Sequence, residues 1–261
     1  MNPDWRNRYE VAQEAAAKAG KHALSYFDTD FEVEWKADES PVTIADKEAE
    51  IMIREIVSEK FPDDGFLGEE MEDIPSSSGY RWILDPIDGT RSFVRGNPIW
   101  GTLVGLEYKG EQIAGVADAP ALGINFRGLR GDGSYCNDKP IKVSTVDTLE
   151  KSHLFYSSLK WFMEKGNEGA FLELIHRTER QRGYGDFWGF MLVAQGSGEM
   201  MFEYGCSPWD LCALAAIIAE AGGKLTDWEG NSTIYRRDVM ASNGLVHDEA
   251  LQVFKGKWPQ R

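Results

Sequence analysis

The sequence predicts an α/β protein of the α+β kind, with a mostly antiparallel N-terminal sheet and a smaller mixed C-terminal sheet. Two stretches with helical apolar spacing open the chain, and short apolar strands separated by turns follow up to about residue 145. Beyond that point helices alternate with short apolar runs. We therefore predict an N-terminal α+β domain over 1–145 and a C-terminal α/β domain over 146–261.

The first half begins with an amphipathic helix over 4–27, since apolar residues recur there every three or four positions. Alternation over 31–35 predicts a strand, and 38–41 breaks the chain. A second helix is expected over 43–60, and the turn residues Pro62-Asp63-Asp64-Gly65 end it. The strands expected next cover 66–68, 81–84, 101–108, 112–118, 123–129 and 141–143.

The second half carries three expected helices, over 159–180, 188–194 and 209–221. Short apolar runs over 154–156, 200–204 and 239–241 lie between them and predict strands. No linker-like composition marks the boundary near residue 145, so the two halves are separated by their pattern alone.

Charge and cysteine content exclude several function classes. The 261 residues contain 28 Lys and Arg against 43 Asp and Glu, a formal charge of −15. Such an acidic chain lacks the basic surface that nucleic acids and anionic membranes attract. Cys136, Cys206 and Cys212 are an odd number, which predicts free thiols, and no signal-peptide pattern opens the chain. We expect a cytoplasmic protein.

The richest motif is Trp82-Ile83-Leu84-Asp85-Pro86-Ile87-Asp88-Gly89-Thr90. A strand ends in two carboxylates three positions apart, and Pro86 stiffens the bend between them. Carboxylates that converge repel one another unless a cation lies between them, and oxygen ligands alone favour Mg²⁺. The alternative is an ordinary surface turn, which uses the same residue types. The apolar strand before the motif favours a site.

Two more acidic positions fit such a site. Glu69 and Glu70 follow a short apolar strand, and Asp210 lies in the first turn of an apolar helix. Each has a plainer interpretation. The two glutamates are equally compatible with solvated surface acids, and Asp210 with a residue that favours a helix N-terminus through the helix dipole.

Taken together, these motifs resemble the inositol monophosphatase-like superfamily of Mg²⁺-dependent, lithium-sensitive phosphatases. The matching pieces run in order over nearly the whole chain: 41–46, 68–70, 82–93, 209–210 and 221–223. The resemblance implies the sugar-phosphatase fold, a layered αβαβα sandwich, and a homodimer. It also implies a phosphomonoesterase that binds roughly two to three Mg²⁺ per subunit.

The resemblance assigns the metal ligands by position. Glu69, Asp85 and the carbonyl of Ile87 would hold one Mg²⁺, and Asp85, Asp88 and Asp210 a second. Glu69 would also serve a looser third ion through waters. Physical reasoning agrees, because a phosphate dianion meets a strongly negative protein and needs added positive charge.

The resemblance also assigns catalytic and phosphate-binding groups. Thr90, paired with Asp46, would orient the attacking water and help to deprotonate it. The N–H groups of Gly89 and Thr90 would face the phosphate. Direct attack by a metal-activated water requires no cysteine or histidine nucleophile.

The stretches expected to contact the leaving group of the substrate depart from the usual inositol phosphatase pattern. Phe93-Val94-Arg95-Gly96 and the stretch 182–188 resemble the histidinol-phosphate phosphatase branch, which serves histidine biosynthesis. Asp186 and Glu203 would pair with a cationic leaving group. Asp186 is alternatively a helix N-cap, and Glu203 also suits inositol hydroxyls.

Other residues near these motifs have two interpretations each. Arg182 bonds either substrate or its own backbone neighbours, and Arg95 faces either substrate or a partner subunit. Trp188, Tyr184 and Phe187 either stack on a ring or belong to the core.

The sequence leaves three alternative hypotheses for the function of the chain. The first is hydrolysis of L-histidinol phosphate to histidinol and phosphate. The second is an inositol-1-phosphate or broader sugar-phosphate phosphatase on the same site. The third is a non-catalytic module that binds Mg²⁺ or a phosphometabolite, which is disfavoured because every expected ligand is present.

Overall fold

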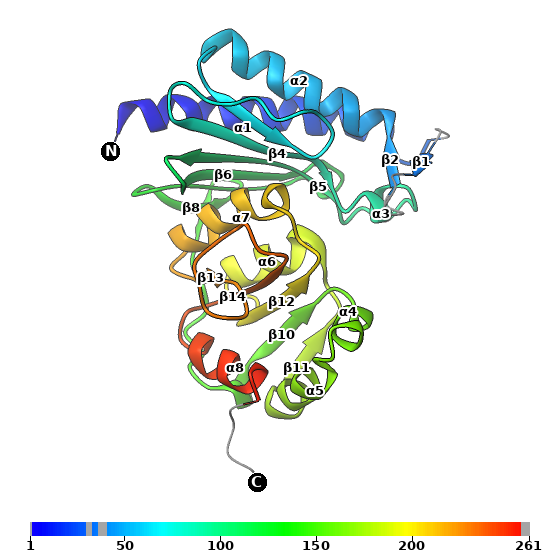
Figure 1. The fold of residues 1–261 in the computed structure, drawn as a ribbon, viewed down its shortest axis with the longest axis vertical. Coiled ribbons are helices and arrows are strands. Elements are labelled where there is room, and N and C mark those ends of the chain that lie inside the picture. The colour runs from blue at the N-terminus through cyan, green and yellow to red at the C-terminus, as the bar shows by residue number, and fades with distance from the viewer. Residues whose placement is uncertain (1, 30–32, 36–40, 257–261) are drawn as a thin grey trace.

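The computed structural model describes residues 2–29, 33–35 and 41–256, and it shows five stacked layers (Figure 1). Two helices cover a large sheet, a second pair of helices lies beneath it, and a smaller sheet with its own outer helices completes the stack. The αβαβα sandwich implied by the resemblance is therefore confirmed.

The first layer consists of α1 (Pro3–Leu24) and α2 (Ile44–Lys60), which pack side by side on the large sheet. Asn2 caps α1, since its side chain accepts a hydrogen bond from the backbone N–H of Asp4 at 2.9 Å. Thr43 and Asp46 form a capping box at the start of α2. This cap fixes where α2 begins and so where its acidic residues lie.

The large sheet has seven strands in the order β3-β4-β5-β6-β7-β8-β9. Their bounds are β3 (Gly65–Gly68), β4 (Tyr80–Asp88), β5 (Gly101–Tyr108), β6 (Glu111–Ala119), β7 (Ile124–Leu129), β8 (Gly133–Cys136) and β9 (Lys139–Ile141). All neighbours are antiparallel except β3 and β4, which run parallel. That exception places the carboxyl ends of both strands at one edge.

The middle layer holds α6 (Asp186–Ala194) and α7 (Pro208–Glu220). Helix α7 lies close to the large sheet because the sheet presents glycines to it. A Cβ at Gly115 would overlap the backbone of Ala213, and one at Gly105 would meet Cys212. One apolar cluster joins Ile83 and Leu103 of the large sheet to α6, α7 and the smaller sheet.

The smaller sheet has five strands in the order β11-β10-β12-β14-β13, with parallel and antiparallel pairs. Their bounds are β10 (His153–Tyr156), β11 (Arg180–Arg182), β12 (Met200–Tyr204), β13 (Lys224–Thr226) and β14 (Asp238–Ser242). Its outer face packs against α4 (Leu159–Glu164), α5 (Glu168–Arg177) and α8 (His247–Phe254). The predicted mixed character of this sheet is confirmed.

Several short elements complete the described chain. Strands β1 (Val33–Trp35) and β2 (Pro41–Thr43) pair antiparallel, and α3 (Thr90–Phe93) follows β4. Single 3-10 turns cover Pro120–Leu122 and Leu149–Lys151. Residues 31 and 32 of the strand predicted over 31–35, and 38–40 of the predicted break, lie outside the described residues.

One expectation about these elements was wrong. The helix expected over 159–180 is two helices and a strand, because Gly166 adopts a left-handed conformation (φ +69°) and ends the first helical stretch. The N-terminal sheet is mostly antiparallel, as predicted, with β3 and β4 running parallel. Strands β8 and β13 and helix α8 were not expected at all.

The predicted boundary near residue 145 falls between the two sheets, since β9 ends at Ile141 and β10 begins at His153. The apolar cluster described above nevertheless crosses it, so the two sheets share one core. Within the described residues, no helix combines the length and the apolar character that crossing a bilayer requires.

Candidate active site

Two strand ends bring the first acidic side chains together. Gly68 pairs with Leu84 in the parallel register of β3 and β4, and the N–H of Glu69 donates to the carbonyl of Leu84 at 3.2 Å. The next residue on β4 is Asp85. Because the two strands run in the same direction, Glu69 and Asp85 leave the sheet at neighbouring positions.

A β-bulge turns Asp85 and Asp88 to the same side. Asp85 pairs with Leu103 and Asp88 pairs with Gly101, so β4 holds one more residue than β5 over this interval. Residues three apart in a regular strand face opposite sides, and the extra residue reverses this. The carbonyl of Pro86, inside the bulge, accepts a hydrogen bond from the Thr102 hydroxyl at 2.8 Å.

Helix α7 supplies the third carboxylate. Asp210 lies in its first turn, where its Oδ2 accepts a hydrogen bond from the N–H of Ser207 at 2.7 Å. One oxygen from each of Asp85, Asp88 and Asp210 lies within 4.8 Å of the others. Residues from both halves of the chain therefore form one acidic cluster, as the sequence predicted. The capping interaction of Asp210 coexists with this placement.

The cluster carries more negative charge than its surroundings neutralise. Burial, followed by the charges of Glu69 and Asp88, raises the pKa of Asp85 well above its usual range. Burial likewise raises the pKa of Asp210 to about 7. Among the described residues, the buried Oδ1 of Asp85 has no hydrogen-bond partner. Buried oxygens without donors suit a hard divalent cation, so these residues fit Mg²⁺.

Thr90 and Asp46 lie together beside the cluster. The Thr90 hydroxyl is 3.0 Å from the carbonyl of Ile87 and 3.4 Å from Oδ1 of Asp46. The other oxygen of Asp46 accepts hydrogen bonds from the backbone N–H and the hydroxyl of Thr43, at 2.8 and 2.6 Å. Burial raises the pKa of Asp46 to about 6. Gly89, with φ +85°, makes the turn that leads into Thr90.

A cleft of about 700 Å³ opens next to the cluster, and Asp88, Asp186, Glu203 and Asp210 contribute to its lining. Glu203 is buried, and its Oε1 accepts hydrogen bonds from the Ser157 hydroxyl and from the N–H of Tyr204. Its buried Oε2 has no partner among the described residues. Burial raises the pKa of Glu203 to about 8.

Asp186 is the first residue of α6, with Gly185 in the N-cap position, so Asp186 is not the N-cap residue. It has a left-handed backbone conformation, with φ +53°. A Cβ on Gly89 would lie 3.3 Å from its Oδ2, which places this carboxylate against the turn before Thr90. Asp186 thus lies in the cleft beside the acidic cluster.

Arg182 and Trp188 are not among the residues that line the cleft. Arg182 is exposed and donates to the carbonyl of Gln181 at 2.8 Å, so it bonds its own backbone neighbour. Trp188 is half-buried, and its ring packs edge-on against Phe126 and Phe187, with centroids 6.2 and 6.0 Å away. Of the aromatic residues considered, the half-exposed Tyr184 and the buried Phe187 reach the cleft.

Other residues of the cleft were not predicted. The exposed arginines Arg91 and Arg237 and the ring of Trp161 contribute to its lining. Arg237 donates to the carbonyl of Gly205 at 3.1 Å. Arg91 follows the predicted motif directly and could have been found there. Trp161 was placed within a long helix, and nothing local marks Arg237.

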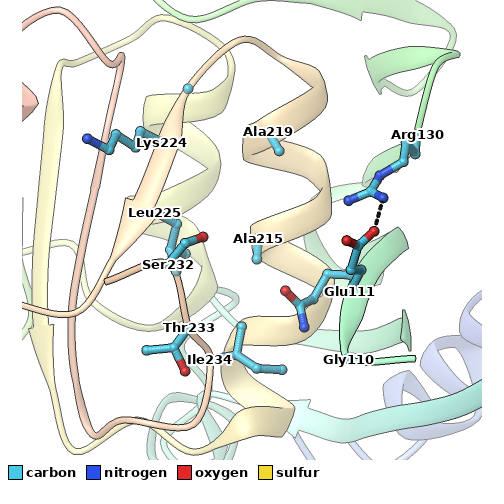
Figure 2. Close-up of a pocket in the computed structure, with 12 residues that line it drawn as sticks. Gly110, Glu111, Arg130, Ala215, Ala219, Lys224, Leu225, Ser232, Thr233 and Ile234 are labelled. Atoms are coloured by element: carbon cyan, nitrogen blue, oxygen red, sulfur yellow. Dashed lines mark hydrogen bonds and ion pairs between the residues drawn. The ribbon is translucent and has the colours of Figure 1, made fainter. Parts of the chain in front are cut away.

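A second cavity, of about 370 Å³, lies beside a different face of α7. Figure 2 shows Ala215 and Ala219 facing it from the helix, with Arg130 paired to Glu111 at its edge. Among its lining residues in the described chain, Glu111 alone carries a carboxylate. The larger cleft is therefore the candidate active site.

Known proteins are similar to this chain in sequence and in fold. The family model described as the inositol monophosphatase family matches residues 4–256. A histidinol-phosphatase from Chlorobaculum parvum is 40% identical over 94% of this chain and 92% of its own length. A histidinol-phosphatase from Streptomyces coelicolor is 38% identical over 95% of this chain and 97% of its own.

A solved inositol monophosphatase from Anabaena has a TM-score of 0.86 at 30% identity, and the match covers 98% of each chain. The family match spans both sheets and every residue of the acidic cluster. The family acts on small phosphate monoesters and is generally metal-dependent, and the three-carboxylate cluster is a place where a metal could bind. This chain belongs to the inositol monophosphatase family and is a phosphoric monoester hydrolase.

Proposed function

We propose that this chain is a Mg²⁺-dependent phosphatase of L-histidinol phosphate. The observation that supports the Mg²⁺ dependence is the cluster of Asp85, Asp88 and Asp210, whose oxygens lie within 4.8 Å of one another. Glu69, Asp85 and the carbonyl of Ile87 would hold one Mg²⁺, and the three aspartates a second. Glu69 would serve a third ion through waters. Divalent cations held there supply Lewis acidity and positive charge for the phosphate.

The residues of the chain position the attacking water. Thr90 would hold it through its hydroxyl and pass a proton toward Asp46, whose Oδ1 lies 3.4 Å away. The hydrogen bonds from Thr43 keep the other Asp46 oxygen occupied, so Oδ1 is the one that faces Thr90. The N–H groups of Gly89 and Thr90 would bind phosphate oxygens at the turn after the bulge.

Histidinol phosphate suits the acidic side of the cleft. Its ammonium and imidazole would meet the carboxylates of Asp186 and Glu203. Asp186 is exposed, and the buried Oε2 of Glu203 has no partner within the part of the chain that the structure describes. An ammonium bound there would compensate that buried oxygen. The half-exposed ring of Tyr184 could lie over the imidazole or the ammonium. The names of the two curated relatives agree with this substrate.

A second candidate is an inositol-1-phosphate or broader sugar-phosphate phosphatase. The exposed guanidinium groups of Arg91 and Arg237 favour it, since they suit a hydroxyl-rich or anionic leaving group better than a cationic one. The two candidates use the same metal site and differ only in what fills the cleft.

A substrate panel with Mg²⁺ decides between them. The panel compares kcat/KM for histidinol phosphate, inositol-1-phosphate, fructose-1,6-bisphosphate and 3′-phosphoadenosine compounds. We expect histidinol phosphate to be preferred, and a preference for an inositol or sugar phosphate would select the second candidate. The homodimer stays a prediction from the resemblance, and the cytoplasmic location stays a prediction from the cysteines. Sedimentation of the purified chain tests the dimer.

A further inference from the structure

A buried ion pair contacts the loop that carries Glu69. Glu50 and Arg54, one turn apart on α2, are 0% and 7% exposed. The Nε of Arg54 donates to Oε1 of Glu50 at 2.9 Å, and its Nη2 lies 2.7 Å from the same oxygen. None of the functional groups proposed above uses this pair.

The pair binds three consecutive residues after Glu69. Oε2 of Glu50 accepts the backbone N–H of Glu70 at 2.8 Å. The guanidinium of Arg54 donates to the carbonyl of Glu72 at 3.0 Å and to that of Met71 at 3.4 Å. On its other side, the N–H of Glu69 is bound to β4. The backbone around Glu69 is therefore fixed from both directions.

Gly68 provides the space that this arrangement needs. A Cβ at Gly68 would overlap the carboxylate of Glu50, so the missing side chain lets α2 approach the end of β3. A buried charged pair is costly to keep when it only adds stability, because apolar side chains of similar volume often serve as well. A role in placing the loop accounts for the pair.

Helix α2 links the two parts of the site. Asp46, Glu50 and Arg54 are spaced four residues apart and share one face of α2. Asp46 lies next to Thr90, and Glu50 holds the loop of Glu69. We propose that Glu50 and Arg54 are positioning residues that hold Glu69 toward Asp85 for metal binding, an inference that rests on the proposed metal site.

The test measures metal affinity directly, by titrating the purified chain with Mn²⁺ and following free Mn²⁺ by electron paramagnetic resonance. Glu50→Gln keeps the size of the side chain but loses the charge that holds Arg54. We expect its Mn²⁺ dissociation constant to rise by about 10-fold to 100-fold, the range typical of residues that support metal ligands. The kcat at saturating Mg²⁺ should stay near that of the unmodified chain.

Asp64→Asn is the matched control. Asp64 is also a buried carboxylate bound by an arginine, Arg8, and it immediately precedes β3 while Glu69 immediately follows it. The control should lower the melting temperature and leave Mn²⁺ affinity unchanged. An equal loss of affinity in both variants, or none in Glu50→Gln, would overturn the positioning role.

A second variant keeps the test decisive if Glu50→Gln does not fold. Arg54→Lys keeps the charge beside Glu50, but one ammonium cannot replace the planar guanidinium that reaches both carbonyls. It should weaken Mn²⁺ binding several-fold, and unchanged binding would count against the proposal. If the unmodified chain bound no Mn²⁺ at all, that result would refute the proposed metal site. It would thus be distinguishable from a result that refutes only the positioning role of Glu50 and Arg54.

Discussion

The backbone N–H of Phe187 donates a hydrogen bond of 2.6 Å to Oδ2 of Asp88, across 99 positions of sequence. This contact ties the start of α6 to the bulge of β4. Asp186, next to Phe187, is thereby held beside the acidic cluster. One hydrogen bond thus connects a residue proposed to select the leaving group with the residues proposed to bind metal.

Replacing Asp88 by Asn tests the metal role of the bulge. The amide oxygen of Asn can still accept the bond from Phe187, so the fold should persist, while one negative charge of the cluster is lost. We expect Mg²⁺-dependent phosphate release to fall at least about 100-fold. Circular dichroism checks the fold, and turnover equal to that of the unmodified chain would refute the assignment.

Lithium should inhibit the enzyme at concentrations in the millimolar range, as the family resemblance implies. The expected mechanism is competition at a labile Mg²⁺ position of the cluster. Phosphate release at saturating substrate is measured with LiCl and with equal concentrations of NaCl, which corrects for ionic strength. Complete insensitivity to lithium would count against such a labile position.

Asp186→Ala tests selectivity. Removing the carboxylate should lower kcat/KM for histidinol phosphate by about 10-fold to 100-fold, the value of a charge-assisted hydrogen bond, and should affect inositol-1-phosphate less. Arg182→Ala is the control, because Arg182 bonds its own neighbour outside the cleft. Equal losses on both substrates would dismiss Asp186 as the selecting group.

Buried His247 makes stability depend on pH. The hydroxyl of Thr226 donates to the carbonyl of Asp227, so it accepts from Nε2 of His247 at 2.9 Å. The hydroxyl of Ser242, which accepts the N–H of Gly244, lies 2.8 Å from Nδ1 and has its own hydrogen free to donate there. This network suits a neutral imidazole that donates from Nε2 and accepts at Nδ1. Burial lowers the pKa of His247 to about 4.

In the unfolded chain the same imidazole has a pKa near 6.5. Between these values the unfolded chain binds a proton that the folded protein does not, so stability falls as the pH drops from about 6.5 toward about 4. By pH 5 the loss from this group amounts to about 2 kcal/mol. Urea unfolding at several pH values, for the unmodified chain and for His247→Gln, measures it. An NMR titration with His247 near 6.5 would contradict the prediction.

Most helices and strands could be predicted because their apolar periodicity is strong, as in β5 and α2. The metal ligands were recognisable because their residue types and spacing are unusual and their motifs resemble a family. The β-bulge that makes Asp85 and Asp88 converge depends on pairing with β5, a contact between separate strands. The local sequence indicates the bend at Pro86, but it does not show how the residues of β4 pair with those of β5 across that bend.

The leaving-group side was harder to predict, because helix phase decides which aromatic residue faces the cleft. In helix α6, which begins at Asp186, Trp188 is half-buried and packs against Phe126, while Phe187 one residue earlier reaches the cleft. Apolar spacing alone does not set that phase. Arg237 reaches the cleft from a separate stretch beside Gly205, which only the folded chain brings near.

The central claim is that carboxylates from separate strands and from α7 together hold divalent cations. Crystals soaked in MnCl₂ and measured at the manganese absorption edge test it most directly. We predict an anomalous peak between the carboxylates of Asp85, Asp88 and Asp210. Full occupancy of Mn²⁺ elsewhere on the molecule with no peak between these three residues would contradict the account.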